Sequence, residues 1–266
     1  MCDVKLPHWN LVRMKQASRL RARPKPNYGL DLPRRVRLLF AMGASAILAG
    51  LFLPSFYVGD FHITLVGPTL LALGSLSLGI CASMLAYSFW GKFNIRKRML
   101  GMVRWRGNET VLDLGTGRGL LAIGAAKRLR TGTVVSVDDW PAAGSACKRL
   151  EAAQRNLDLA RVHDRVELRS DDPRHIAFVD NSFDVVLSLL FLHNIGDASG
   201  RAKACCEIAR VLKPHGIAII ADYANAKEYA RALEATGLRV DGPKRCFLEA
   251  FIALEIVTAR KLCERL

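Results

Sequence analysis

The stretch that decides the fold runs Val111-Leu-Asp-Leu-Gly-Thr-Gly-Arg-Gly-Leu120. A short apolar run contains Asp113 near its end, three glycines follow at alternate positions, and a helical pattern begins at Leu120. Glycines at such a turn permit positive φ angles and let a ligand lie against bare backbone at the start of a helix. The spacing is D-x-G-x-G-x-G, whereas a nicotinamide dinucleotide site is typically G-x-G-x-x-G. An acid at the end of the strand can receive an ammonium group, which nicotinamide dinucleotides lack.

Further acids follow the next two predicted strands. Asp138 ends the second strand, 19 residues after Gly119, where a carboxylate can accept both hydroxyls of a ribose. Asp171 and Asp172 follow the third strand, where a carboxylate can accept a hydrogen bond from an adenine amino group. Each acid alone could also be a helix cap or a turn residue. Acids beyond three successive parallel strands favour a site for a cofactor that contains a nucleoside.

Outward from this stretch, short β-branched runs alternate with helical stretches. This alternation is typical of an α/β fold with a doubly wound, mostly parallel sheet and helices on both faces. The pattern predicts strands at Thr110–Leu114, Thr133–Asp138, Val166–Arg169, Phe183–Leu190, Gly216–Ala221, around Leu238–Val240, and at Phe251–Ala259. It predicts helices at Leu120–Leu129, Ala142–Asn156, Gly200–Val211 and Ala226–Thr236. Pro214 and Gly216 indicate a turn before the fifth strand.

Residues from about 107 to 260 resemble the class I S-adenosylmethionine (SAM)-dependent methyltransferases. VLDLGTGRGLL resembles the family's first motif, VVSVDD its ribose-binding acid, and SDDPRHIAFVDNSFDVVLSLLFLHNI its adenine loop and fourth strand. EIARVLKPHGIAII resembles the following helix and fifth strand, where Lys-Pro-Gly-Gly is usual and His215 replaces a glycine. The resemblance implies SAM as the cofactor and a Rossmann-like sheet of seven strands, the last of them antiparallel.

The resemblance also implies roles for individual residues, carried over by matching positions. The methionine part of the cofactor would lie on Asp113, Gly115, Thr116, Gly117 and Gly119. Asp138 would hold the ribose and Asp172 the adenine, with Asp139 and Trp140 beside them. Because the register of the third loop is open by one residue, Asp171 is the alternative partner for the adenine.

The acceptor side is expected at the end of the fourth strand, Leu189–Asn194. The implied reaction displaces a methyl group in line from the sulfonium to a nucleophilic O, N, S or C atom. Proximity and orientation supply most of the catalysis, and a general base is needed only when the nucleophile starts protonated. His193 is the candidate base, because a neutral imidazole titrates near working pH. A histidine that only orders the loop is the alternative interpretation.

Charge is distributed very unevenly along the chain. The 266 residues carry a formal net charge of +15, with ten basic side chains in residues 1–37 and six in residues 92–106. Residues 38–91 contain only Asp60 among charged residues, and residues 107–266 have a net charge of +2. This small excess on the catalytic part argues against a nucleic-acid substrate, for which phosphate contacts dominate affinity. No Cys or His spacing predicts a metal site.

The uncharged segment, residues 38–91, predicts a transmembrane helical hairpin with spans at about 38–58 and 65–90. A span needs ~20 apolar residues, and Tyr87, Phe89 and Trp90 stand where aromatic residues meet the membrane surface. Basic residues on both flanks predict that both termini and the catalytic domain are cytosolic. The remaining parts are then a basic cytosolic tail (1–37), a basic juxtamembrane linker (92–106) and a methyltransferase domain (107–266). Two buried helices of a soluble core, or a signal peptide, are the alternatives.

Three functions are compatible with this organisation. The leading prediction is a membrane-anchored methyltransferase whose acceptor is small or lipid-like, because the anchor holds the domain at a bilayer surface. The second is a membrane-tethered protein methyltransferase. The third is a membrane module that binds SAM without catalysis, since cofactor motifs do not establish turnover.

Overall fold

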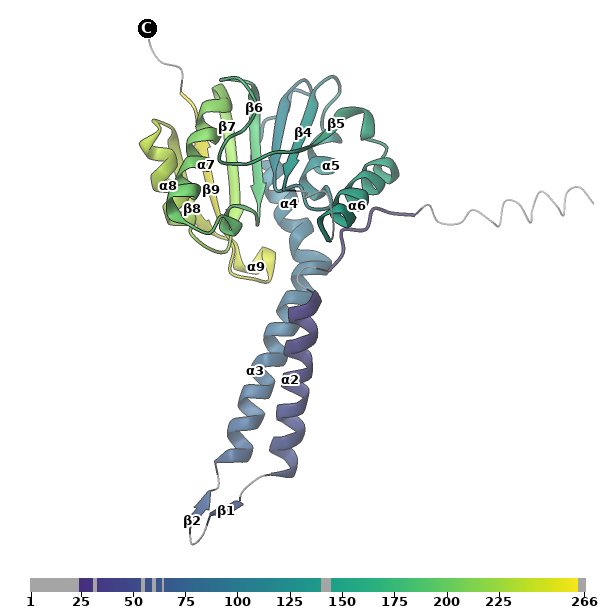
Figure 1. The fold of residues 1–266 in the computed structure, drawn as a ribbon, viewed down its shortest axis with the longest axis vertical. Helices are drawn as coiled ribbons and strands as arrows, with labels where there is room; N and C mark the ends of the chain where they lie inside the picture. Colours follow the sequence, from purple (N-terminus) through teal and green to yellow (C-terminus); the bar gives the residue numbers. More distant parts are fainter. Residues whose placement is uncertain are drawn as a thin grey trace, which may run out of the picture.

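The computed structural model describes residues 24–30, 33–53, 56–58, 61–63, 65–139 and 145–262. A long helical hairpin projects from one end of an α/β domain (Figure 1). Most of the predicted basic tail, residues 1–23, lies outside the described residues, as does Trp140.

The domain is built on one seven-stranded sheet in the order β5-β4-β3-β6-β7-β9-β8. All neighbouring pairs are parallel except the two that involve β9, so β9 alone runs antiparallel to the rest. This confirms the predicted Rossmann-like sheet. The strands are β3 (Thr110–Leu114), β4 (Thr133–Asp138), β5 (Val166–Ser170), β6 (Phe183–Leu189), β7 (Leu212–Asp222), β8 (Arg239–Arg245) and β9 (Glu255–Arg260).

Helices cover both faces of this sheet, and each face has its own apolar core. One core joins α4 and α5 to inward residues such as Val111, Leu187 and Ile219. The other joins α7 and α8 to the opposite side of the same strands, through residues such as Leu112 and Val186. The helices are α4 (Lys92–Gly101), α5 (Leu120–Ala126), α6 (Ser145–Ala160), α7 (Ala198–Val211), α8 (Ala226–Ala235) and α9 (Phe247–Ala250).

Three predicted strand boundaries are wrong, one of them the end of the sixth strand, since β8 continues beyond Val240 to Arg245. β7 begins at Leu212 and includes the expected turn as an irregularity, because Leu212 pairs with Phe183 while Ile217 pairs with Val185. Residues 251–254 do not belong to the last strand, which starts at Glu255. The short helix α9 precedes them and ends at Ala250, and the positive φ of 60° at its C-cap Phe251 turns the chain away from an extended course.

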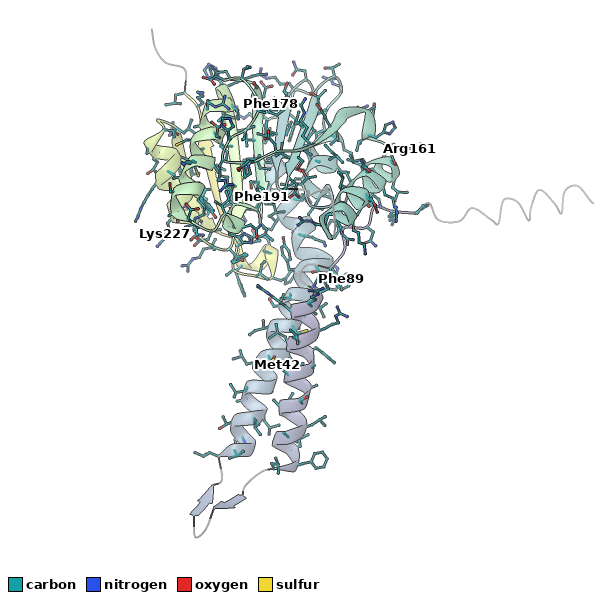
Figure 2. The ribbon with its side chains drawn as sticks, in the orientation of Figure 1. Met42, Phe89, Arg161, Phe178, Phe191 and Lys227 are labelled. Atoms are coloured by element: carbon teal, nitrogen blue, oxygen red, sulfur yellow. The ribbon has the colours of Figure 1, made fainter. Side chains whose placement is uncertain are left out.

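The hairpin consists of α2 (Pro33–Phe52) and α3 (Val66–Ala86), with a short antiparallel pair, β1 (Phe56–Val58) and β2 (Phe61–Ile63), between them. Both helices are long and apolar enough to cross a membrane by length and composition. The first helix begins before the predicted boundary, because proline suits the first turn of a helix. Large apolar side chains such as Met42 and Phe89 project outward from the hairpin (Figure 2).

Small residues bring α2 and α3 together. Gly50 faces the backbone of Gly67, and Gly43 faces Gly74 and the side chain of Leu78. Both glycines are therefore at the contact, whereas Gly79 has open space where a side chain would begin. Close packing of backbones is how helices associate without a hydrophobic driving force.

The segment that follows α3 is helical and is part of the domain core. A π-helical turn η1 (Tyr87–Gly91) joins α3 directly to α4, so one helix runs from Val66 to Gly101. Ile95, Met99 and Leu100 on α4 are almost completely buried against the sheet. The stretch expected to be a basic linker is thus a helix packed against the sheet, which joins the hairpin to the α/β domain.

The carboxyl ends of the parallel strands lie on the side of the domain from which the hairpin projects (Figure 1). The first residue of β9, Glu255, pairs with Asp222 at the carboxyl end of β7. Just before it, α9 packs against η1 and α4, where Asn94 Nδ2 donates to Glu249 O at 3.2 Å. The residues between α9 and β9 therefore connect the contact with η1 and α4 to the carboxyl edge of the sheet.

Residues 24–30 also tie the hairpin to this edge of the domain. Asn27 exchanges two hydrogen bonds with the Asn156 side chain of α6, at 2.8 and 3.0 Å. The same amide donates to Arg118 O in the glycine turn at 2.9 Å, and Lys92 Nζ donates to Gly29 O at 2.5 Å. The chain before α2 thus lies between the glycine turn and the start of α4.

Candidate functional site

The glycine turn after β3 is sharp and crosses the loop after β6. Gly115, Gly117 and Gly119 all have positive φ angles, of 82°, 55° and 83°. A side chain at position 115 would overlap Phe191, which follows β6 (Figure 2). β3 and β6 are neighbouring strands: from β3 the chain continues to β4 and β5 on one side, and from β6 it continues to β7 on the other side. Ligands of open α/β sheets bind in the crevice at such a change in strand order.

Asp113 is buried near the end of β3 with one carboxylate oxygen, Oδ1, that has no hydrogen-bond partner. Its Oδ2 lies 3.5 Å from Ser136 Oγ on β4. Burial, and then the nearby charge of Asp138, raise the pKa of Asp113 to about 7. An unsatisfied buried carboxylate is costly to the fold and is characteristic of a site that receives a ligand.

Asp138, at the end of β4, is joined to the glycine turn. Its Oδ2 accepts a hydrogen bond from Gly117 N at 2.7 Å. Burial raises the pKa of Asp138, while the Gly117 N–H lowers it by a smaller amount. Thr116 between the glycines is buried, and its Oγ1 donates to Val137 O at 3.4 Å. The glycine turn and the acid at the end of β4 are therefore in direct contact.

Asp139, Asp171 and Asp172 line a cavity of about 480 Å³ together with Phe191 and Asn194. Asp171 accepts the N–H groups of Asp172 and Ala177, at 2.9 and 2.8 Å. The carboxylate of Asp172 accepts two strong hydrogen bonds from Arg174, which hold its pKa below the ordinary value. Both acids are at the expected edge, and neither is distinguished as the one that would bind a base.

His193, after β6, forms a pair with Asp222 at the end of β7. The distance from His193 Nδ1 to Asp222 Oδ1 is 2.8 Å, and the His193 N–H donates to Asp222 Oδ2 at 3.2 Å. The imidazole is 17% exposed and the carboxylate 1% exposed. Because a carboxylate can only accept, it favours the proton on Nδ1 and leaves the Nε2 lone pair available. The ring of Tyr223 lies 4.5 Å from the imidazole, centroid to centroid.

Sequence reasoning missed Asp222 and Tyr223, whereas Phe191 lies within the stretch Leu189–Asn194 that was expected on the acceptor side. Asp222 directly follows the predicted fifth strand, so the rule that found the other acids would also have found it. The contact between Asp222 and His193 joins residues 29 positions apart, and its prediction requires the order of the strands in the sheet. The structure thus brings the predicted site residues that it describes, all except Trp140, to one edge of the sheet and adds Asp222 to His193.

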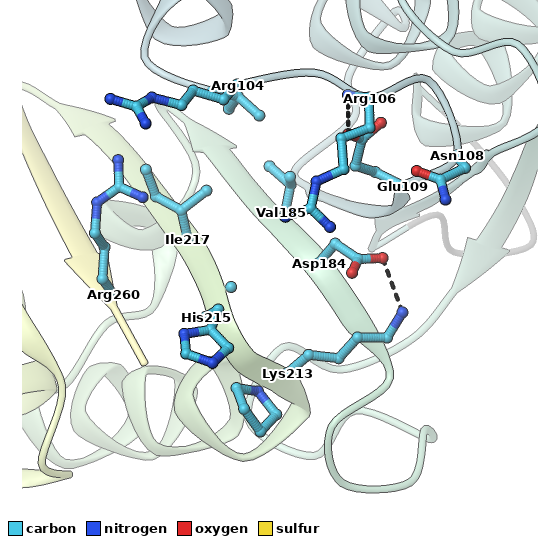
Figure 3. Close-up of a pocket in the computed structure, with 13 residues that line it drawn as sticks. Arg104, Arg106, Asn108, Glu109, Asp184, Val185, Lys213, His215, Ile217 and Arg260 are labelled. Carbon is cyan, nitrogen blue, oxygen red and sulfur yellow. Dashed lines mark hydrogen bonds and ion pairs between the residues drawn. The ribbon is translucent and has the colours of Figure 1, made fainter. Parts of the chain in front are cut away.

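A second cavity, of about 430 Å³, lies at the opposite edge of the sheet (Figure 3). It is lined by basic residues that include Arg104, Arg106 and Arg260. Its two acids have partners: Asp184 accepts from Thr110 N and Lys213 Nζ, both at 2.8 Å, and Glu109 accepts backbone N–H groups. None of the predicted site residues lies there. Among the described residues, no group of His, Cys, Asp and Glu could hold a metal ion.

Comparison with known proteins agrees with this geometry. Residues 112–220, from β3 to β7, match the family described as a methyltransferase domain. Over this segment the chain is similar to methyltransferase domains. The cofactor that this similarity supports is SAM.

Several curated methyltransferases are similar to the domain. Demethylmenaquinone methyltransferase of Lactiplantibacillus plantarum is 37% identical over 120 residues, which cover 45% of this chain and 47% of that protein. A ubiquinone/menaquinone biosynthesis C-methyltransferase of Bdellovibrio bacteriovorus is 31% identical over 133 residues, covering 48% and 50%. 27-O-demethylrifamycin SV methyltransferase of Amycolatopsis mediterranei is 34% identical over 143 residues, covering 54% and 48%. The chain spans about half the length of these relatives.

Solved structures share the fold at low sequence identity. A SAM-dependent methyltransferase from Aquifex aeolicus aligns with a TM-score of 0.51 at 20% identity, covering 64% of this chain and 92% of that one. The [4+2]-cyclase SpnF aligns with a TM-score of 0.53 at 17% identity, covering 64% and 80%. A methyltransferase and a cyclase share this fold, so the reaction must be argued from the site.

Proposed function

We propose that the chain is a membrane-anchored SAM-dependent methyltransferase that methylates a small, lipid-like acceptor. The observation that carries the proposal is the position of the cofactor edge, on the side of the domain from which the apolar hairpin projects (Figure 1). The names of two relatives point to the same class of acceptor, because menaquinone and ubiquinone are lipid-soluble quinones.

The hairpin supports membrane anchoring. Only 17% and 11% of the most apolar stretches of its two helices are buried within the chain, which favours membrane spans over core helices of a soluble domain. A signal sequence would be removed, whereas α3 continues through η1 into the buried helix α4. The basic residues at both ends of the hairpin favour a cytosolic catalytic domain.

The carboxyl edge fits SAM in its donor set. Asp113 would accept the ammonium group of the cofactor, which gives its buried Oδ1 a partner. The glycine turn would lie along the methionine part, since the space next to Gly117 is open where a side chain would stand. Asp138 would accept from the ribose, and Asp171 or Asp172 from the adenine, with Asp139 beside them. When bound, SAM supplies an electrophilic methyl group on a sulfonium.

His193 and Asp222 would prepare the acceptor for methylation. Nε2 of His193 would accept the proton of an acceptor hydroxyl, which makes the oxygen, or a conjugated ring carbon, nucleophilic. Asp222 fixes the ring through Nδ1 and stabilises the imidazolium that forms. The exposed Tyr223 beside the imidazole supplies an aromatic surface for an unsaturated acceptor.

The proposal is tested with the full-length protein in lipid vesicles and SAM that carries a radioactive methyl group. The acceptors are a demethylated naphthoquinol with an isoprenoid tail and a lipid extract of the membranes in which the protein naturally occurs. We expect label in the solvent-extractable lipid fraction, and much less with His193→Gln.

Other outcomes would favour the two alternative functions. Label that stays with membrane proteins after lipid extraction would indicate a protein methyltransferase. SAM binding by calorimetry without any transfer, in lipid or protein fractions, would indicate a membrane module that only binds the cofactor.

A further inference from the structure

The short helix α9 is held firmly against the helix that leaves the hairpin. Arg98 of α4 forms an ion pair with Glu249, and the Ser83 hydroxyl donates to the carbonyl of Phe251. A side chain at Gly91 would overlap the carbonyl oxygen of Ala250, so glycine is required for this close approach. Contacts on both sides of the π-helical turn fix the position of α9.

These contacts place α9 at the level where the hairpin would enter a membrane. Ser83 lies inside α3, seven residues before Trp90. At the rise of a helix, this separation is about 10 Å along the axis. The segment that contacts Ser83 therefore reaches below the exposed aromatic pair Phe89 and Trp90, toward the apolar part of the hairpin.

The outward side of α9 is apolar. Phe247 is 60% exposed and Phe251 is 39% exposed. The acid of this segment, Glu249, is paired with Arg98, which removes an isolated negative charge from the surface. Aromatic side chains at such a level are suited to a membrane interface, where an apolar ring lies near lipid and the backbone meets polar groups.

We propose that residues 247–251 insert into the bilayer interface and form the entrance through which a lipid-dissolved acceptor reaches the methyltransferase site. This inference rests on the proposed membrane anchoring. Its occupant is the lipid bilayer, because the segment is continuous with the exposed apolar surface of α3 through the Ser83 contact.

The proposed entrance is close along the chain to the strand that pairs with Asp222, the partner of His193. Residues 252–254 connect α9 to Glu255, which pairs with Asp222 at the end of β7. Asp222 holds His193, and the 53% exposed ring of Tyr223 lies beside it. An acceptor that leaves the bilayer beside Phe251 would therefore meet an aromatic ring and then the imidazole.

Spin labels on the full-length protein in phosphatidylcholine–phosphatidylglycerol vesicles test the insertion. Serine replaces the native cysteines Cys2, Cys147, Cys206 and Cys263. A nitroxide is then attached to the single cysteine introduced by Phe247→Cys. Val179→Cys is the matched control, because Val179 is 78% exposed and precedes β6 at the opposite edge of the sheet. Leu76→Cys on α3 reports on the hairpin itself.

We expect the label at position 247 to collide more with oxygen, which dissolves in lipid, than with a water-soluble nickel complex. The label at 179 is expected to show the reverse. If the label at 247 collides more with the nickel complex while the label at 76 collides more with oxygen, the proposed insertion is wrong and the membrane anchoring by the hairpin still holds. Nickel-favoured collision at both positions would overturn the membrane anchoring as well.

The double variant Phe247→Ser/Phe251→Ser tests the role of the entrance. With a tailed demethylated naphthoquinol in the same vesicles, we expect an apparent KM raised about tenfold, with SAM affinity retained. Methylation of the tail-less ring in solution is expected to stay within about twofold of wild type. An equal loss with both acceptors would refute the entrance and indicate damage to the site.

Discussion

The two edges of the sheet carry cavities of similar size and very different chemistry. The cavity at the amino edge has a volume of about 430 Å³ and is lined by exposed arginines, and its acids Asp184 and Glu109 each accept two hydrogen bonds. The carboxyl edge has a cavity of about 480 Å³, and the same edge holds three glycines with positive φ and a buried carboxylate with an unpartnered oxygen. Size does not distinguish a functional site here. Unsatisfied polar groups and backbone that only glycine tolerates do.

The largest difference is expected between two histidines on opposite edges. His193→Gln removes the proposed base and should lower kcat by about 100- to 10,000-fold while SAM affinity is kept. His215→Asn, at the amino edge, should leave kcat within about twofold, because asparagine tolerates its positive φ of 65°. Steady-state kinetics with a tailed quinol measure both. Similar losses in the two variants would mean that the catalytic edge has been misassigned.

A pair of acids gives the next largest contrast. Asp138→Ala should weaken SAM binding by roughly 100-fold, since it removes hydrogen bonds to a charged group. The matched variant Asp184→Ala at the amino edge should bind SAM as wild type does. Isothermal titration of detergent-purified protein with SAM, its demethylated product and NAD decides this. Unchanged SAM affinity in Asp138→Ala would contradict the proposed ribose contact.

The raised pKa of Asp113 predicts a pH dependence of cofactor binding. The carboxyl is neutral below its pKa of about 7 and cannot then attract an ammonium group. SAM affinity should therefore fall as the pH falls through 7, by about tenfold from pH 8 to pH 6, with proton release on binding near pH 6. Asp113→Asn should bind weakly with a flat profile. A wild-type profile that is flat would exclude Asp113 as the partner of the ammonium.

The smallest effect is expected from Lys213 at the amino edge. Lys213→Ala breaks its partly exposed ion pair with Asp184 and should lower the free energy of unfolding by less than about 1 kcal/mol. Urea unfolding in detergent measures this change, and SAM affinity should not move. A large loss of SAM binding would show that the two edges are coupled.

Much of the fold could be predicted because its signals are local. Short apolar and β-branched runs predicted four strands, β3, β4, β5 and β6, and the carboxyl end of β7, to within about one residue. The acids Asp113, Asp138, Asp171 and Asp172 were predicted from their places at the ends of three of these runs, and they do lie at one edge. Continuous apolar runs carry this information, because a parallel sheet with helices on both faces buries both sides of each strand.

The remainder depends on contacts between distant segments. The stretch from Lys92 looked like a linker because its basic residues mask the buried stripe of Ile95 and Met99. The strand expected from Phe251 is interrupted because α9 packs on the helix below it, which no local pattern indicates. The His193–Asp222 pair likewise could be predicted only from the knowledge that β6 and β7 are neighbours in the sheet.

The uninterrupted helix from Val66 to Gly101 has a kinetic consequence for the proposed enzyme. Because this helix is part of the domain core, His193 is held at a constant height above the lipid, and acceptor molecules meet it only by lateral diffusion in two dimensions. The encounter rate then follows the number of acceptor molecules per lipid and not their number per litre. Adding inert lipid at a fixed total amount of acceptor should slow turnover in proportion to this surface dilution.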